Sequence, residues 1–89
     1  MIPNHKIVWA GIESFAHKHN LSCSGLAKLS GMDATTFNRS KRTTHYGKER
    51  WPSMQSIVKV VQATNSSFED FVECMRDEFL KQQEKSKGN

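Results

Sequence analysis

The feature that most restricts the fold of this chain is a pair of short helical segments separated by a glycine, in the stretch LSCSGLAKLSGMDATTFNRSKR that begins at Leu21. Ser22 is a typical helix N-cap, and Gly31 is typical of the left-handed residue that ends a helix. Asp33 follows as a possible second N-cap. Two helices joined by a tight turn are therefore expected, at about Cys23 to Ser30 and about Ala34 to Ser40.

The side chains within this pair indicate how the two helices would pack. Ala27 lies in the middle of the earlier helix, and it is small enough for a neighbouring helix to cross close by. Leu26, Met32 and Phe37 occupy spacings that point inward and would fix the helices at a steep angle. The first turn and the outer face of the later helix would then project into solvent.

Three further helices are expected, and no segment reads as a convincing strand. The first would begin after Asn4 and run to about His19. The fourth would follow Ser53 and end near Thr64, and the fifth would start at a capping box of Ser66-Ser67-Phe68-Glu69. Each carries an apolar face, formed by Val8, Ile12, Phe15 and Ala16, by Met54, Ile57, Val58 and Val61, and by Phe68, Phe71, Val72, Met75 and Phe79.

Helices this short are unstable alone, so their apolar faces must pack together. The sequence therefore predicts one compact, all-α domain of five helices over residues 4–83, followed by a flexible polar tail at residues 84–89. We expect Trp51 to pack on the core beside the fourth helix. The stripe from Phe68 to Phe79 is read as core rather than dimer surface, although its last turn, with Phe79 and Leu80, exceeds what so small a domain can bury.

Charge is distributed unevenly along the 89 residues, whose net charge is +4. Eight Lys and Arg stand against three Asp and Glu up to Pro52, and five stand against six after it. The basic excess is densest from Arg39 to Arg50. A basic half on an ordinary globular scaffold suggests a surface that faces a polyanion.

Several other classes of protein are disfavoured. The chain has neither a long apolar run nor a secretory leader, so we expect no membrane contact and a location in the cytoplasm. Cys23 and Cys74 are expected to be free, partly buried thiols, and the His residues do not cluster with them at metal-binding spacing, so no metal or cofactor is expected. No GxSxG, HExxH or phosphate-binding glycine loop is present, so we expect no enzyme and no small-molecule ligand.

The ordered set of Ala27, Gly31 and Phe37 resembles the lambda-repressor-like (XRE-like) helix-turn-helix regulators of bacteria and phages. The motifs RWPS and ATNSSFEDF extend the likeness to a subgroup of phage-type repressors, over about residues 8–80. In many members of that subgroup such a domain precedes a self-cleaving serine-protease-like domain. The resemblance implies a five-helix fold with the helix-turn-helix at its second and third helices.

The resemblance also implies a mode of binding, in which the third helix enters the major groove. Arg39 suits guanine and Asn38 suits adenine. The candidate base-reading residues are Ala34, Thr35, Asn38 and Arg39. The candidate contacts to the DNA backbone are Ser22, Ser24, Lys28, Thr36, Lys41, Arg42, Thr43, Lys48 and Arg50.

This chain departs from the family at two places. Many members carry Gln where Cys23 and Ala34 stand, so the contacts of those Gln side chains do not transfer. The polar loop from Lys41 to Trp51 is longer than in the phage prototypes. The sequence also allows simpler interpretations. Arg39 could form an ion pair with Glu49, and the loop could be merely solvated. His45 and Tyr46 could either stack on a sugar or lie in water.

The leading hypothesis is a transcriptional regulator, a repressor, that binds double-stranded DNA sequence-specifically as a homodimer on a two-fold symmetric site. The alternative is a protein-interaction module, antitoxin-like or anti-repressor-like, that keeps the fold without specific DNA binding. The acidic last helix and Phe79 favour the alternative.

Overall fold

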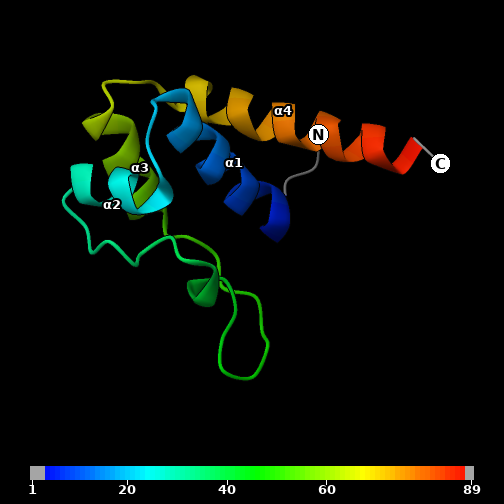
Figure 1. Cartoon of the computed structure of the whole chain (residues 1–89), viewed down its shortest axis with the longest axis horizontal. Coiled ribbons are helices and arrows are strands. Elements are labelled where there is room, and N and C mark those ends of the chain that lie inside the picture. Colours follow the sequence, from blue (N-terminus) through cyan, green and yellow to red (C-terminus); the bar gives the residue numbers. More distant parts are fainter. Residues whose placement is uncertain (1–3, 88–89) are drawn as a thin grey trace.

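A computed structural model describes residues 4–87, which form four α-helices and one 3-10 turn. These elements are α1 (His5–Lys18), α2 (Cys23–Leu29), η1 (Arg39–Lys41), α3 (Met54–Ala63) and α4 (Phe68–Lys87). α1 runs beside α4, α2 and α3 lie together at one end, and a long loop projects from the opposite side to α4 (Figure 1). The all-α prediction is confirmed, and the count of five helices is not.

Side-chain caps set the starts of three helices, as the sequence predicts. The side chains of Asn4, Ser22 and Ser53 each accept a hydrogen bond from the backbone N–H three residues further on, at 2.9, 3.0 and 3.0 Å. Such a bond satisfies one of the N–H groups that the first helical turn leaves without a partner. After α2, Gly31 has a φ of 75°, the left-handed conformation expected there.

The helix predicted at about residues 34–40 is wrong. Backbone bonds from Thr36 N to Asp33 O and from Asn38 N to Thr35 O, both 3.0 Å, form consecutive turns, and Asn38 is extended with ψ 151° before η1. The Asp33 carboxylate accepts from Thr35 N at 2.8 Å. A helix N-cap makes the same bond, so the cap is present but the helix does not continue. The β-branched Thr35 and Thr36 favour a helix only weakly, and the chain leaves helical geometry at Asn38. The helix-turn-helix arrangement is therefore not confirmed.

The start of α4 also differs from the prediction. The capping box is formed by Ser67 and Asp70, one residue later than expected: Asp70 N donates to Ser67 Oγ at 3.2 Å, and Ser67 N donates to Asp70 Oδ2 at 3.0 Å. The hydrogen bond from Ser67 lowers the pKa of the Asp70 carboxyl below its ordinary value. α4 then continues to Lys87, beyond the expected end near Gln83, and residues 88–89 of the expected tail lie outside the described part of the chain.

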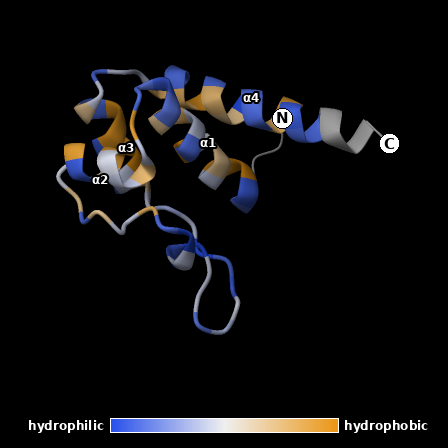
Figure 2. Cartoon of the chain, in the orientation of Figure 1, coloured by the Kyte–Doolittle hydropathy of each residue, from blue (hydrophilic) through white to orange (hydrophobic). Residues whose placement is uncertain are grey.

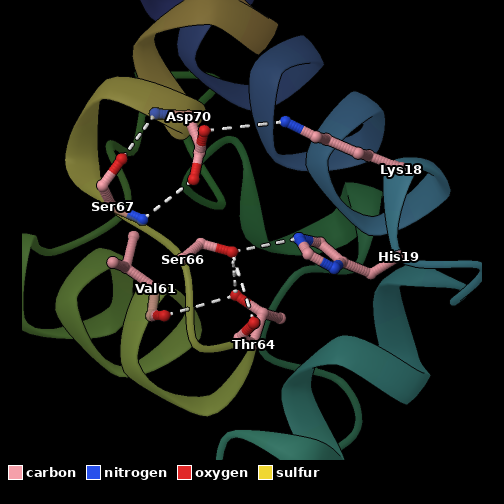
Figure 3. A network of polar contacts seen from close by, with 7 residues as sticks. All are labelled: Lys18, His19, Val61, Thr64, Ser66, Ser67 and Asp70. Atoms are coloured by element: carbon pink, nitrogen blue, oxygen red, sulfur yellow. Dashed lines mark hydrogen bonds and ion pairs between the residues drawn. The ribbon is translucent and has the colours of Figure 1, made fainter.

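Ser66 serves a different purpose, because it joins the ends of three helices (Figure 3). Its hydroxyl lies 3.2 Å from His19 Nε2 and 2.9 Å from Thr64 Oγ1, and Thr64 Oγ1 donates to Val60 O at 2.8 Å. Lys18 Nζ lies 3.8 Å from Asp70 Oδ1 beside this network. These contacts hold the C-terminal ends of α1 and α3 against the start of α4.

The core is one cluster of buried apolar residues contributed by the four helices and Phe37. Hydrophobic residues concentrate in the helices, whereas the projecting loop is largely hydrophilic (Figure 2). The largest fully buried side chains are Phe15, Phe37, Ile7, Ile12, Leu26 and Val60. Phe37 is buried although its segment is not helical, so its predicted inward position is confirmed. Burying a side chain of this size contributes about 1.5–3 kcal/mol.

Three predicted core positions are exposed. Met54 is 66% exposed and Trp51 is 54% exposed, so the expected packing of Trp51 on the core is wrong. In α3 the buried face is Ile57, Val60 and Val61. In α4 Phe71 and Cys74 are buried, whereas Phe68 is exposed. Within residues 4–87 no helix combines the length and apolar character needed to cross a membrane.

Candidate nucleic-acid interface

The projecting loop from Arg42 to Arg50 folds back on itself through one isolated antiparallel bridge, between Thr43 and Glu49, and is hereafter called the basic hairpin. Arg50 N donates to Arg42 O at 2.9 Å, and Thr44 N donates to Lys48 O at 2.7 Å. Gly47, with a φ of 79°, closes the turn by donating to Thr44 O at 2.9 Å. The sequence predicts only an irregular loop here, so the hairpin is more ordered than expected.

Two side chains of α1 hold the base of the basic hairpin. His5 Nε2 lies 2.8 Å from Arg42 O and 2.9 Å from Arg50 O, and Trp9 Nε1 donates to Arg50 O at 2.9 Å. Carbonyl oxygens only accept, so the contacts with Arg42 O and Arg50 O require a proton on His5 Nε2; with that proton in place, the 3.1 Å approach of Trp9 Nε1 to the same nitrogen is not a hydrogen bond. The first and last carbonyl groups of the hairpin are thereby tied to the same turn of α1.

The guanidinium of Arg42 is engaged inside the protein. Its Nη2 donates to Glu13 Oε1 at 2.7 Å and to Phe37 O at 3.4 Å, and its Cζ lies 5.1 Å from the centre of the Trp9 ring. The side chain is only 18% exposed. Arg42 therefore links α1 to the chain around Phe37, although the sequence analysis places it on DNA phosphate.

Two other residues predicted to contact phosphate line one cleft. Lys41 and Arg50 line a hollow of about 320 Å³ together with Thr36. The N-terminal turn of α3 closes it with hydroxyl-bearing residues Ser53 and Ser56. Two cations and several hydroxyl groups around one opening can neutralise and hydrogen-bond an anionic group such as a phosphate diester.

Arg39, the first residue of η1, lies in a different environment from Lys41. It lines a hollow with Ser22 and Cys23 of the α2 start and with the carboxylate-bearing residues Glu13 and Glu78. The pKa of the Cys23 thiol is raised by burial and by the charge of Glu13. Arg39 and Ser22 are thus brought together, but next to negative charge.

The remaining predicted residues vary in exposure. Thr35 and Asn38 are exposed, and Ala34 is half-buried. Among the predicted backbone contacts, Lys28, Thr43 and Lys48 are exposed and Ser24 is half-buried. Thr35 is not free to reorient, because its backbone N–H and its hydroxyl both bond to Asp33.

Asp33 places a negative charge within this basic region. Hydrogen bonds from the side chain and the backbone of Thr35 lower the pKa of its carboxyl, and the nearby Lys41 ammonium adds to the effect. The carboxylate is therefore ionised at neutral pH, and it orients the turn while reducing the local positive potential. Glu49, placed by one reading in a pair with Arg39, instead lies with Oε2 3.8 Å from His5 Nδ1.

Sequence reasoning missed the three residues of α1 that support this surface. His5, Trp9 and Glu13 recur at every fourth position, which places them on one flank of the helix beside its apolar face. This spacing was a usable signal, since a polar and aromatic flank on an otherwise buried helix indicates a second contact surface. The groups that this surface contacts could not be predicted from the sequence, because the partners of His5 lie 37 and 45 residues away from it in the chain.

Within the described part of the chain, no three His, Cys, Asp or Glu residues gather as a metal site would require. Comparisons with protein-family models, with curated protein sequences and with solved structures found no match to this chain.

Proposed function

We propose that the chain is the DNA-binding domain of a transcriptional regulator, a repressor, which binds double-stranded DNA sequence-specifically as a homodimer on a two-fold symmetric site. The observation that carries the proposal is the cleft that Lys41 and Arg50 line together with Thr36. The likeness of residues 8–80 to the phage-type repressors supports the same reading. No catalytic role is proposed for any residue.

The charges around the cleft favour a polyanion over a small acidic ligand. From Arg39 to Arg50 the chain carries five Lys and Arg and one carboxylate, Glu49, which faces His5. With Arg42 paired to Glu13, two cations line the cleft, Lys41 and Arg50, and two more are exposed outside it, Arg39 and Lys48. Cations at more than one place fit a chain of phosphates, each neutralised by one cation.

The test is selection from a random duplex library with the purified chain at two salt concentrations. An enriched symmetric motif with half-sites about one helical turn apart would support a dimeric regulator. Lys41→Ala and Arg50→Ala should then weaken binding to all sequences alike and each reduce the salt dependence by about one phosphate contact. Lys81→Ala, on α4, is the matched control. Unchanged binding in both cleft variants would contradict the proposal.

A second candidate, a protein-interaction module, is favoured by one observation. An apolar hollow of about 290 Å³ lies between α3 and α4, next to the exposed side chains of Trp51, Met54 and Phe68. Exposed apolar side chains around a hollow are typical of protein contact surfaces. Failure of the chain to bind any duplex at low salt would favour this candidate over DNA binding.

A further inference from the structure

We infer that the basic hairpin enters the major groove of duplex DNA as a two-stranded ribbon, with His45 and Tyr46 at its tip against the base edges. The inference rests on the proposed DNA binding and adds the element that reads the groove. It takes the place of the helix expected at residues 34–40, which the chain does not form.

The size of the hairpin selects the groove. Paired strands lie about 4.8 Å apart between backbones. Side chains widen such a ribbon beyond the minor groove of about 6 Å, whereas the major groove of about 12 Å admits a two-stranded ribbon. Four residues from Arg42 to the tip, at about 3.3 Å each, give a reach of about 13 Å. This reach exceeds the depth of the major groove, about 8.5 Å.

The side chains at the tip suit contact with bases. Tyr46 is 88% exposed, and its ring meets His45 edge-on with the ring centres 5.4 Å apart. The phenol and the imidazole each offer a hydrogen-bond donor and an acceptor, which the edges of the bases can match. Lys48 is exposed on the side of the hairpin that returns from the tip, while Glu49 lies near His5 at the base, so the tip carries no carboxylate.

The base of the hairpin is built to hold this ribbon in one orientation. An isolated two-stranded hairpin is only marginally stable in water. Here His5 and Trp9 bond to the carbonyl groups at both ends, and Trp9 is only 4% exposed. A hairpin fixed before binding loses less conformational entropy when it meets the groove.

The experiment compares Tyr46→Ala and Lys48→Ala with the control variants Leu80→Ala and Lys81→Ala on α4, using the duplex selected by the wild-type chain. Dimethyl sulfate reports both grooves at once, because it methylates guanine N7 in the major groove and adenine N3 in the minor groove. Thermal unfolding confirms that each variant is folded, as expected for changes at exposed side chains.

Wild type should protect guanine N7 positions, and Tyr46→Ala should lose part of that protection together with about 10- to 100-fold in affinity. The controls should behave as wild type. Affinity within about twofold of wild type and an unchanged N7 pattern in Tyr46→Ala would overturn the inference while leaving the proposed function standing. Loss of adenine N3 protection instead would overturn the assignment to the major groove. A wild-type chain that binds no duplex would overturn the proposed function itself, and the inference with it.

Discussion

Replacing Arg42 by alanine should destabilise the protein itself, because its guanidinium is used internally. The change removes the 2.7 Å bond to Glu13, with side chains 18% and 37% exposed, and the position over the Trp9 ring. A charge-assisted hydrogen bond contributes about 1.5–3 kcal/mol to stability. Because both side chains are partly exposed to solvent, we take the lower end of this range. The contact over the ring adds about 0.5–1 kcal/mol. We expect a loss of about 2–3 kcal/mol from a total of about 4–13 kcal/mol for a domain of this size.

The measurement is urea and thermal unfolding of Arg42→Ala, Glu13→Ala and the double variant. The midpoint of thermal unfolding should fall by about 10–20 °C in Arg42→Ala, given about 4–8 °C per kcal/mol in a domain of this length. The double-variant cycle should return a coupling of about 1–2 kcal/mol between Arg42 and Glu13. Arg39→Ala, at an exposed arginine three residues earlier, is the matched control and should change stability by less than about 0.5 kcal/mol.

The opposite pattern would refute this reasoning. If Arg42→Ala unfolds at the wild-type midpoint but loses affinity for DNA, the guanidinium faces phosphate, as the sequence analysis expects, and the contact with Glu13 contributes nothing. Arg42→Lys separates the two roles further, because lysine keeps the charge but lacks the planar guanidinium that lies over the Trp9 ring while its Nη2 reaches Glu13 and Phe37. It should retain little of the lost stability.

Three further expectations follow from the packing and the titrating groups. Gly11→Ala should lower the free energy of unfolding in urea by about 1–3 kcal/mol, since the new Cβ would overlap Met75 Cγ and lie 3.4 Å from Met75 Cα. An unchanged urea midpoint would mean that α1 and α4 do not approach this closely. The pKa of Asp70 is lowered from its ordinary 3.8 in the folded state, so its contribution to stability is complete above that value and lost as the pH falls through the folded pKa. Asp70→Asn should therefore unfold at lower urea near neutral pH and lose stability less steeply in acid, and a parallel pH profile would contradict this. Burial raises the pKa of the Cys74 thiol. In a Cys23→Ser variant, Cys74 should therefore react with a thiol reagent more slowly in the folded than in the unfolded chain. Equal rates would count against the burial of Cys74.

Local chemistry explains which elements the sequence could predict. A cap needs only a side chain and an N–H group three residues later, so Asn4, Ser22 and Ser53 were readable as helix starts. The same rule failed by one residue at α4, because Ser66 and Ser67 both precede an acidic residue by three positions. The capping role goes to Ser67, since the hydroxyl of Ser66 is taken by Thr64 and His19.

The candidate site was less predictable because it depends on competition and on distant contacts. The segment after Asp33 carries a helix-like order of cap and apolar residues, and Asp33 does bond to Thr35 as a cap would, but the chain then forms two successive turns and becomes extended at Asn38. The exposure of Asn38 and Arg39 agrees with the prediction that their side chains reach outward, whereas the internal pairing of Arg42 depends on Glu13, from another helix. No local pattern distinguishes an arginine that meets phosphate from one that meets a carboxylate far away in the chain.

α1 connects these observations, because its two ends support different parts of the molecule. At its N-terminal end His5 and Trp9 fix both ends of the basic hairpin, and Glu13 fixes Arg42 one turn further on. At its C-terminal end Lys18 and His19 join α3 and α4 (Figure 3). A change at the second end lowers stability without altering the orientation of the hairpin in molecules that remain folded. A change at His5 or Trp9 frees the hairpin, so it should reduce DNA affinity even where the helices stay folded.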